Sequence, residues 1–286
     1  MSSKPAIDLN KVNVIFHVDD IGMFQSSIAA FSQLCANEKV LSGSLMAPCP
    51  WFAAATRLQQ QFPQADLGLH LTLTSEWNDY RWGPVSPSHI SDGLRDDSGI
   101  YFHQRTEQVV QTADVVAVEN ELRGQIELAK RLGFEPSHLD GHMYTCQQKG
   151  FLPIMLKLAL AYQIQPVVTY DFLAALGEQQ SQYWQQQLKQ AGMSIFNQMA
   201  VFPLVTKPDN SPEKQTTKMR EFLTGLPAGL HYIYAHPSEA GPELKAMSTR
   251  QANMRTAELQ ALLSLDLRAL AASLDINLCT FQDLID

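Results

Sequence analysis

The stretch FHVDDIGM, residues 16–23, decides how the rest of the chain is interpreted. It continues an apolar run that begins at Val12 and is typical of a buried strand. Asp19 and Asp20 then stand side by side where that strand should end, just before a glycine. Adjacent carboxylates repel each other, and burying either one without a partner is costly. The pair therefore calls for a partner that the strand itself does not supply.

Strand and helix patterns alternate along most of the 286 residues. Strand patterns cover 12–18, 43–47, 66–74, 137–144, 166–169, 201–205, 230–235 and 277–280. Helix patterns cover 25–38, 51–61, 106–132, 152–162, 179–190 and 212–223, and one or two further helices are expected in 248–274. Alternation of this kind predicts parallel strands joined by helical crossovers. Because no linker divides the chain, we expect one α/β domain over residues 1–286.

The composition predicts a folded protein and disfavours several classes of partner. Hydrophobic residues make up 45% of the chain and charged residues 17%, which argues against disorder. The formal net charge is −8 and the basic residues are scattered, so we expect no nucleic-acid partner. No apolar run approaches a membrane span, and the first residues lack the apolar core of a signal peptide. The four cysteines form no disulfide or zinc pattern, and we expect a cytoplasmic protein.

Three further strand ends carry histidines: His70 in GLHLTLT, His142 in HLDGHMY and His236 in YIYAHPS. In parallel sheets and barrels, functional sites form at the carboxyl ends of the strands. One carboxylate of the acidic pair and two imidazoles would make a three-ligand metal site with open positions, as in hydrolytic enzymes. A divalent cation would also stabilise the adjacent carboxylates.

Spacing separates the roles of the polar residues in HLDGHMY, residues 138–144. At ~3.3 Å per residue, an extended strand places His138 roughly 13 Å from His142, so both cannot bind one ion. We expect His142, at the carboxyl end, to be the ligand and His138 to pack inside the fold. Asp140 would accept a ring hydrogen bond behind a ligand. Ordinary packed or surface roles are expected for the remaining histidines, His17, His89, His103 and His231.

The stretch of residues 75–105 is the least regular part of the chain and contains several prolines and glycines. A long irregular loop in a compact domain is usually functional or disordered. This one directly follows the strand that carries His70, so we expect it to lie over the functional site.

A receiver domain that is phosphorylated on an aspartate is a second interpretation of an acidic pair after a first strand. It predicts a much shorter chain, a later acceptor such as Asp171 and a lysine at a late strand end. The length of 286 residues and the three strand-end histidines disfavour it.

In their order along the chain, these segments resemble those of the YdjC-like carbohydrate deacetylases. The ADDFG, G-hydrophobic-HL-x-LT, HxDxH and CHPG elements of that family are matched by residues 18–22, 68–74, 138–142 and 235–238. The closing R-x-x-E-L pattern of the family is matched by Arg255, Glu258 and Leu259. The likeness extends from Val12 to about Leu265, nearly the whole chain.

The resemblance implies a distorted TIM-like (β/α) barrel of about seven parallel strands. It implies a hydrolase that removes an N-acetyl group from an amino sugar or related carbohydrate. One divalent ion, Mg²⁺ or Zn²⁺, would be held by Asp20, His70 and His142. Asp19 would be the base that activates water, and His236 the acid that protonates the leaving amine.

Two departures from the family pattern lie beside the expected pocket. The family often has HHHVH after the aspartate, whereas this chain has GHMYT at residues 141–145, and Ser238 replaces the glycine after HP. These changes spare the expected ligands, so they bear on the substrate more than on the reaction class. The alternative is a catalytically silent carbohydrate-binding or regulatory protein on the same barrel.

Three more residues are expected close to the ligands or the substrate. Arg255 comes from the closing family pattern, and Trp77 and Trp82 lie in the irregular loop. The tryptophans would either stack on sugar rings or pack within the loop. The sequence leaves the oligomeric state open, with a homodimer among the alternatives.

Overall fold

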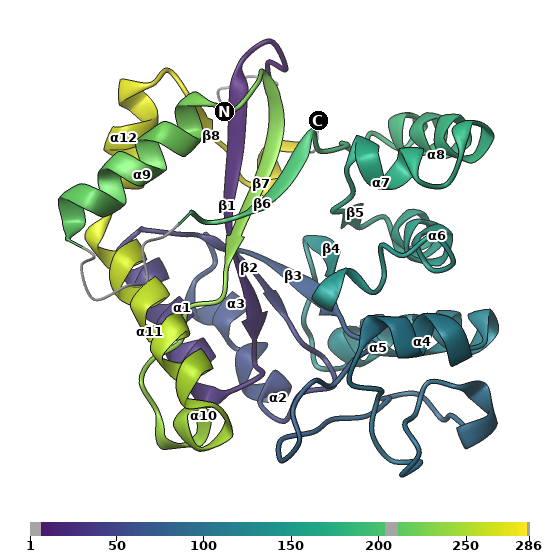
Figure 1. The fold of residues 1–286 in the computed structure, drawn as a ribbon. Coiled ribbons are helices and arrows are strands. Elements are labelled where there is room, and N and C mark those ends of the chain that lie inside the picture. The colour runs from purple at the N-terminus through teal and green to yellow at the C-terminus, as the bar shows by residue number, and fades with distance from the viewer. Residues whose placement is uncertain (1–6, 204–210, 285–286) are drawn as a thin grey trace.

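The fold is a parallel sheet built around β1, the strand that carries the acidic pair (Figure 1). The computed structural model describes residues 7–203 and 211–284. Within them the strand order is β5-β4-β3-β2-β1-β7-β6, and the short β8 pairs with β1. All the strand pairs in this order are parallel. The strands are β1 (Val12–Ile21), β2 (Ser42–Leu45), β3 (Asp66–Leu71), β4 (His138–Gly141), β5 (Gln165–Pro166), β6 (Gln198–Val201), β7 (Gly229–Ala235) and β8 (Asn277–Leu278).

The two edges of the sheet meet, which curls it into a distorted barrel. A parallel bridge pairs Thr169, just after β5, with Phe196, just before β6. The backbone N–H of Phe196 donates to the carbonyl oxygen of Val168 at 2.9 Å, and that of Tyr170 donates to Phe196 at 3.2 Å. The predicted α/β fold, a TIM-like barrel of about seven parallel strands, is confirmed.

Helices cover the outside of the sheet, with α1 and α9 to α12 on one side and α4 to α8 on the other (Figure 1). They are α1 (Gln25–Ala36), α2 (Phe52–Ala55), α3 (Leu58–Gln61), α4 (Thr106–Thr112), α5 (Val115–Arg131), α6 (Leu152–Tyr162), α7 (Tyr170–Ala174), α8 (Glu178–Gln190), α9 (Pro212–Thr224), α10 (Pro242–Met247), α11 (Thr249–Ser264) and α12 (Leu267–Ser273). Short 3-10 turns are η1 (Ile90–Asp92), η2 (His142–Tyr144) and η3 (Phe281–Leu284). In residues 7–203 and 211–284, none of the helices combines the length and apolar character needed to cross a membrane.

Side chains of β1 alternate between two apolar clusters, as a strand buried on both faces requires. Val14, Phe16 and Val18 pack into the large cluster that the strands share with the helices. Ile15 packs into a smaller cluster with Tyr232 and other aromatic residues. His17 and Asp19 follow Ile15 on that face and contact Tyr232, so the first aspartate of the pair belongs to the face opposite the helices.

Two predicted helices are each divided in the structure. The pattern over 106–132 forms α4 and α5, because the side chain of Asp114 accepts hydrogen bonds from the backbone N–H groups of Val116 and Ala117 and starts a new helix. The pattern over 51–61 forms the short helices α2 and α3.

Several predicted strands have different bounds in the structure, among them β6 and β4. The strand expected at 201–205 is β6, Gln198–Val201, and residues 204–210 lie outside the described part of the chain. The strand expected at 137–144 ends at Gly141, because Met143 and Tyr144 adopt left-handed backbone angles, with φ of 54° and 53°. His142 thus opens a turn instead of continuing the strand, which frees its ring to face the barrel mouth.

Candidate metal and catalytic site

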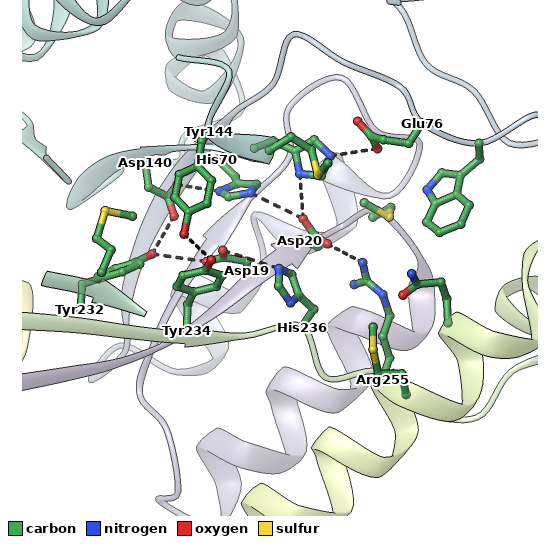
Figure 2. Close-up of a pocket in the computed structure, with 18 residues that line it drawn as sticks. Asp19, Asp20, His70, Glu76, Asp140, Tyr144, Tyr232, Tyr234, His236 and Arg255 are labelled. Atoms are coloured by element: carbon green, nitrogen blue, oxygen red, sulfur yellow. Dashed lines mark hydrogen bonds and ion pairs between the residues drawn. The ribbon is translucent and has the colours of Figure 1, made fainter. Parts of the chain in front are cut away.

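A cavity of about 440 Å³ lies at the carboxyl ends of the strands (Figure 2). Its walls include Asp19, Asp20, His70, His142 and His236, the five residues in which the sequence predicts ligands and acid–base groups. They come from the ends of β1, β3, β4 and β7. The strand order therefore gathers four separate sequence segments into one pocket.

The two aspartates both face this cavity because the strand is irregular between them. Successive residues of a regular strand point to opposite faces. Here the pairing of β1 with β2 shifts register between Val18 and Ile21, and Asp20 adopts a left-handed φ of 64°. That backbone turn brings the Asp20 carboxylate to the same pocket as that of Asp19. Strained backbone of this kind clusters at functional sites.

Three ligand-type atoms converge at the base of the cavity. Asp20 Oδ1 lies 3.5 Å from His70 Nε2 and 3.1 Å from His142 Nδ1. All three residues are buried, and these atoms lie within 4.8 Å of one another. Asp20 Oδ1 is itself inaccessible to solvent and has no well-aligned hydrogen bond within the described residues. A buried carboxylate oxygen without a donor, facing two imidazole nitrogens, fits a divalent cation.

The second nitrogen of each histidine is held by a carboxylate. His70 Nδ1 lies 2.9 Å from Asp140 Oδ1, and His142 Nε2 lies 3.0 Å from Glu76 Oε2. Such partners fix the ring orientation and leave the other nitrogen free for a metal. Asp140 was predicted to accept a ring hydrogen bond, and the structure assigns it to His70. Glu76 was not predicted, and its only sequence signal is an acidic residue two positions beyond the GLHLTLT pattern.

The carboxylates next to His142 control its charge. Burial lowers the pKa of His142, but the carboxylates of Glu76 and Asp20 outweigh it and raise the pKa to about 10. A cation bound by His142 would take the place of that proton, since a histidine binds metals as the neutral imidazole.

Helix α11 holds the site from the other side. The Arg255 guanidinium donates to Asp20 Oδ2 at 2.7 Å. One turn later, Glu258 Oε2 accepts a hydrogen bond from the backbone N–H of His236 at 2.9 Å. Burial alone raises the pKa of Asp20, but Arg255 and His142 outweigh it and hold the pKa well below the usual range. Arg255, which was expected near the ligands or substrate, therefore keeps Asp20 ionised.

Asp19 and His236 face each other across the cavity. Asp19 Oδ2 lies 3.9 Å from His236 Nε2. Asp19 Oδ1 lies 2.8 Å from His17 Nδ1 and 3.3 Å from the Tyr232 hydroxyl oxygen. Burial raises the pKa of Asp19 to about 7 and lowers the pKa of His236. His17 is packed inside the barrel as expected, but its contact with Asp19 was not predicted.

The remaining walls are aromatic and thioether side chains. Tyr144 and Tyr234 join their hydroxyl groups by a hydrogen bond over the pocket (Figure 2). Trp77 lines the cavity together with four methionines, Met23, Met143, Met199 and Met254. Trp82 does not: it is only 3% exposed, and its indole N–H donates to the carbonyl oxygen of Thr74. Of its two expected roles, the structure shows Trp82 packed in the loop, with no ring face open to a ligand.

The protein belongs to the class of α/β-barrel proteins. In this class the functional site forms at the carboxyl ends of the parallel strands, where the buried acidic and imidazole groups lie here. Within that class, a protein-family model described as YdjC-like protein matches residues 13–273. The chain therefore belongs to the YdjC-like family.

Relatives and solved structures extend this comparison. A carbohydrate deacetylase from Thermus thermophilus is 31% identical over 245 residues, which cover 84% of each chain. A carbohydrate deacetylase from Brevibacillus brevis is 25% identical over 286 residues, 96% of this chain and all of that one. A solved structure from Enterococcus faecalis, described as a candidate cellobiose-phosphate cleavage protein, gives a TM-score of 0.75 at 21% identity. It covers 96% of this chain and 100% of that chain, which shows a shared fold.

Proposed function

We propose that the chain is a metal-dependent hydrolase that removes an N-acetyl group from an amino sugar or related carbohydrate. One observation carries the proposal: Asp20, His70 and His142 converge on one point, with Asp19 and His236 facing the same cavity. The two relatives named as carbohydrate deacetylases support the same chemistry and the same class of substrate.

In this proposal Asp20, His70 and His142 hold one divalent cation. A carboxylate with two imidazoles accepts several metals, and Mg²⁺ and Zn²⁺ are the two we propose. When bound, the cation supplies a Lewis acid that polarises an amide carbonyl and makes water more acidic. The outer carboxylates of Asp140 and Glu76 keep the two rings aimed at it.

Asp19 serves as the general base. Its Oδ1 is occupied by His17 and Tyr232, so Oδ2, on the cavity side, is the atom that takes a proton from the attacking water. The water oxygen then bonds to the carbonyl carbon of the acetamide. His236 gives a proton to the nitrogen as the C–N bond breaks, which releases acetate and a free amine. The separation of 3.9 Å between Asp19 Oδ2 and His236 Nε2 supports a role for both groups at one reacting centre.

The walls around this centre suit a sugar ring. Trp77 offers an aromatic face, and the paired hydroxyls of Tyr144 and Tyr234 offer hydrogen bonds. We also propose that the protein works in the cytoplasm, where its four cysteines, all free in the structure, stay reduced.

Acetate release from a panel of N-acetylated mono- and oligosaccharides, with and without chelator, tests the function. We expect release from at least one sugar and its loss on chelation. A matched preparation of Asp19→Asn identifies any contaminating activity. Metal-loaded protein that binds sugars from the panel but releases no acetate would instead support the catalytically silent alternative.

A further inference from the structure

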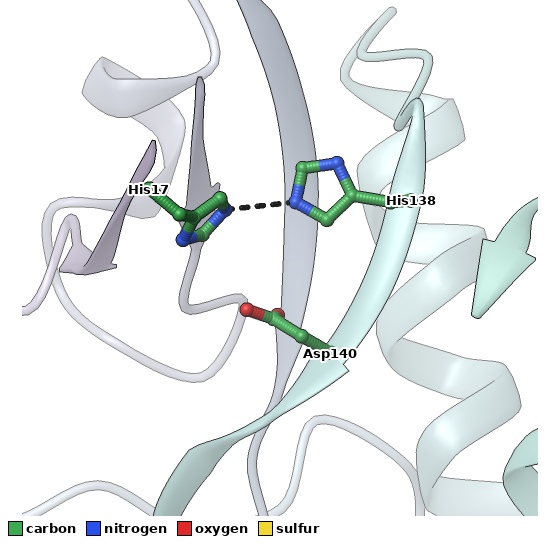
Figure 3. A group of neighbouring side chains, drawn as sticks. All are labelled: His17, His138 and Asp140. Atoms are coloured by element: carbon green, nitrogen blue, oxygen red, sulfur yellow. Dashed lines mark hydrogen bonds between the residues drawn. The ribbon is translucent and has the colours of Figure 1, made fainter. Parts of the chain in front are cut away.

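Two buried histidines lie below the site, and one of them, His17, contacts the proposed base Asp19. His17 on β1 and His138 on β4 are each 0% exposed, and neither lines the cavity. Their Nε2 atoms lie 2.9 Å apart, and the two ring planes are inclined at 74° to each other (Figure 3). Strands β2 and β3 separate β1 from β4 in the sheet, so this contact crosses the barrel interior.

The contact belongs to a continuous chain of short hydrogen bonds. Asp19 Oδ1 and His17 Nδ1 are 2.8 Å apart, and the two Nε2 atoms follow at 2.9 Å. His138 Nδ1 then lies 2.9 Å from Ser137 Oγ. All four ring nitrogens are engaged, and the chain runs from the carboxylate at the barrel mouth to a half-buried serine before β4.

The direction of donation in this chain follows from the groups at its upper end. The Tyr232 hydroxyl oxygen lies 2.7 Å from His17 Nδ1, 2.8 Å from Asp140 Oδ2 and 3.3 Å from Asp19 Oδ1. Its one hydrogen goes to the Asp140 carboxylate, because a charged oxygen is a stronger acceptor than a neutral ring nitrogen. In the ionised form in which it acts as a base, Asp19 only accepts, and the Tyr232 oxygen, having donated its hydrogen to Asp140, also accepts. The hydrogen between these two oxygens and the His17 ring therefore belongs to His17 Nδ1. A neutral His17 then accepts at Nε2, and His138 Nε2 donates to it. His138 Nδ1 is left to accept from Ser137.

Charge and packing agree with this assignment. Burial lowers the pKa of His17 to about 3 and the pKa of His138 well below its usual range, so both rings are neutral. Phe281 stacks on the His138 ring with centroids 3.7 Å apart. Against the same ring stands Gly68, where a Cβ atom would come within 2.4 Å of it. The ring is therefore clamped in the orientation that the chain requires.

We propose that His17 and His138 are positioning residues that aim the carboxylate of Asp19 through this directed chain, with His17 protonated at Nδ1 and His138 protonated at Nε2. The inference rests on the base role proposed for Asp19. By occupying Oδ1, the chain leaves Oδ2 turned toward His236 and the cavity. Neither ring touches the substrate, so its effect falls on turnover and not on binding.

The tautomers are measured by ¹⁵N NMR of the full-length protein labelled at histidine. Signals are assigned by their disappearance in His17→Asn and His138→Gln. We expect a protonated Nδ1 with a bare Nε2 in His17, and the reverse in His138. The opposite tautomer in either ring overturns the proposal. The NMR measurement does not depend on enzyme activity. It therefore tests the direction of the hydrogen-bond chain even if the protein hydrolyses no acetylated sugar.

Activity of paired variants tests the positioning role. The side-chain amide of His17→Asn keeps a donor near the Nδ1 position, whereas His17→Leu removes it. We expect His17→Leu to lower kcat about 10- to 100-fold with KM and metal content unchanged, and His17→Asn to recover most of kcat. Equal kcat in the two variants, or a change confined to KM, contradicts the role.

A matched control is His231→Leu. It removes a buried imidazole of β7 that contacts the carbonyl oxygen of Pro227 and does not belong to the hydrogen-bond chain through His17 and His138. It should retain kcat. If His17→Leu fails to fold, the comparison of His138→Gln with His138→Leu replaces it, with the glutamine variant expected to retain the higher kcat.

Discussion

Asp20 is the residue on which the site depends most. Its left-handed backbone, at φ 64°, costs of the order of 1–2 kcal/mol in a residue other than glycine. Arg255 and the two facing histidines stabilise the conformation, and a cation would add to this. The repulsion between the adjacent aspartates is relieved in the same way, because each has its own set of partners.

Replacing Asp19 by asparagine separates catalysis from metal binding. The amide has nearly the shape of the carboxylate but cannot take a proton from water. We expect acetate release to fall ~100- to 10,000-fold, the usual contribution of a general base, while metal content stays at the wild-type level. Activity and elemental analysis are measured on the same preparation, and near-wild-type turnover would rule out the base role.

Replacing a proposed ligand should lower the metal content more than replacing the carboxylate that contacts the other ring nitrogen of that ligand. His70→Ala and His142→Ala each remove a proposed ligand, and both variants should lose the metal on purification. Glu76→Gln only releases the far nitrogen of His142, so we expect metal affinity to weaken about 10- to 100-fold. Elemental analysis and metal titration measure both effects, with exposed His89→Ala as the control. Full stoichiometry in both alanine variants would disprove the site.

At the scale of elements, the strands that carry the site were predictable because they are continuous apolar runs. β1, β3 and β7 are buried along nearly their whole length, and a polar residue at their ends is conspicuous in the sequence. β6 was misplaced because the apolar run continues beyond it to Val205, whereas the strand itself, Gln198–Val201, is partly exposed. The break between α4 and α5 was missed because the helical periodicity continues across Asp114.

Within the site, the contacts that join distant segments could not be predicted. Tyr232 and Asp140 are 92 residues apart, and no local pattern signals their hydrogen bond. Glu76 lies in a loop whose path depends on tertiary contacts. The left-handed backbone at Asp20 has no signature beyond the glycine that follows at position 22. Sequence patterns thus predict which polar side chains lie at strand ends. Which of these side chains contact one another depends on the tertiary structure of the barrel.

The packing of β3 against β4 gives a prediction about stability. In Gly68→Ala the new methyl group would lie 2.4 Å from the His138 ring, which Phe281 keeps from moving away. We expect a loss of about 1–3 kcal/mol in the free energy of unfolding, measured by denaturant titration. Gly150→Ala is the control, because a Cβ atom there meets nothing within 4 Å. Equal stability of the two variants would show that the ring is not clamped.

At the scale of the whole molecule, the three proposed ligands come from segments that only the complete barrel brings together. Asp20, His70 and His142 follow β1, β3 and β4, and the unfolded chain has no such site. Metal binding should therefore stabilise the entire fold.

With free metal at 100 times its Kd, the expected gain is about 2.7 kcal/mol. Thermal unfolding of stripped and reloaded protein measures it as a rise in Tm on reloading. His142→Ala should show no such rise. A rise of the same size in that variant would place the metal elsewhere.

The central claim, one catalytic metal in a carbohydrate deacetylase, is tested most directly by reconstitution. Chelator-stripped protein is titrated with metal while acetate release is followed on the sugar that the panel selects. The account predicts no release before addition, then a linear rise that levels off at one equivalent of metal per chain. Acetate release that is unaffected by stripping, or that levels off at a different stoichiometry, would contradict it.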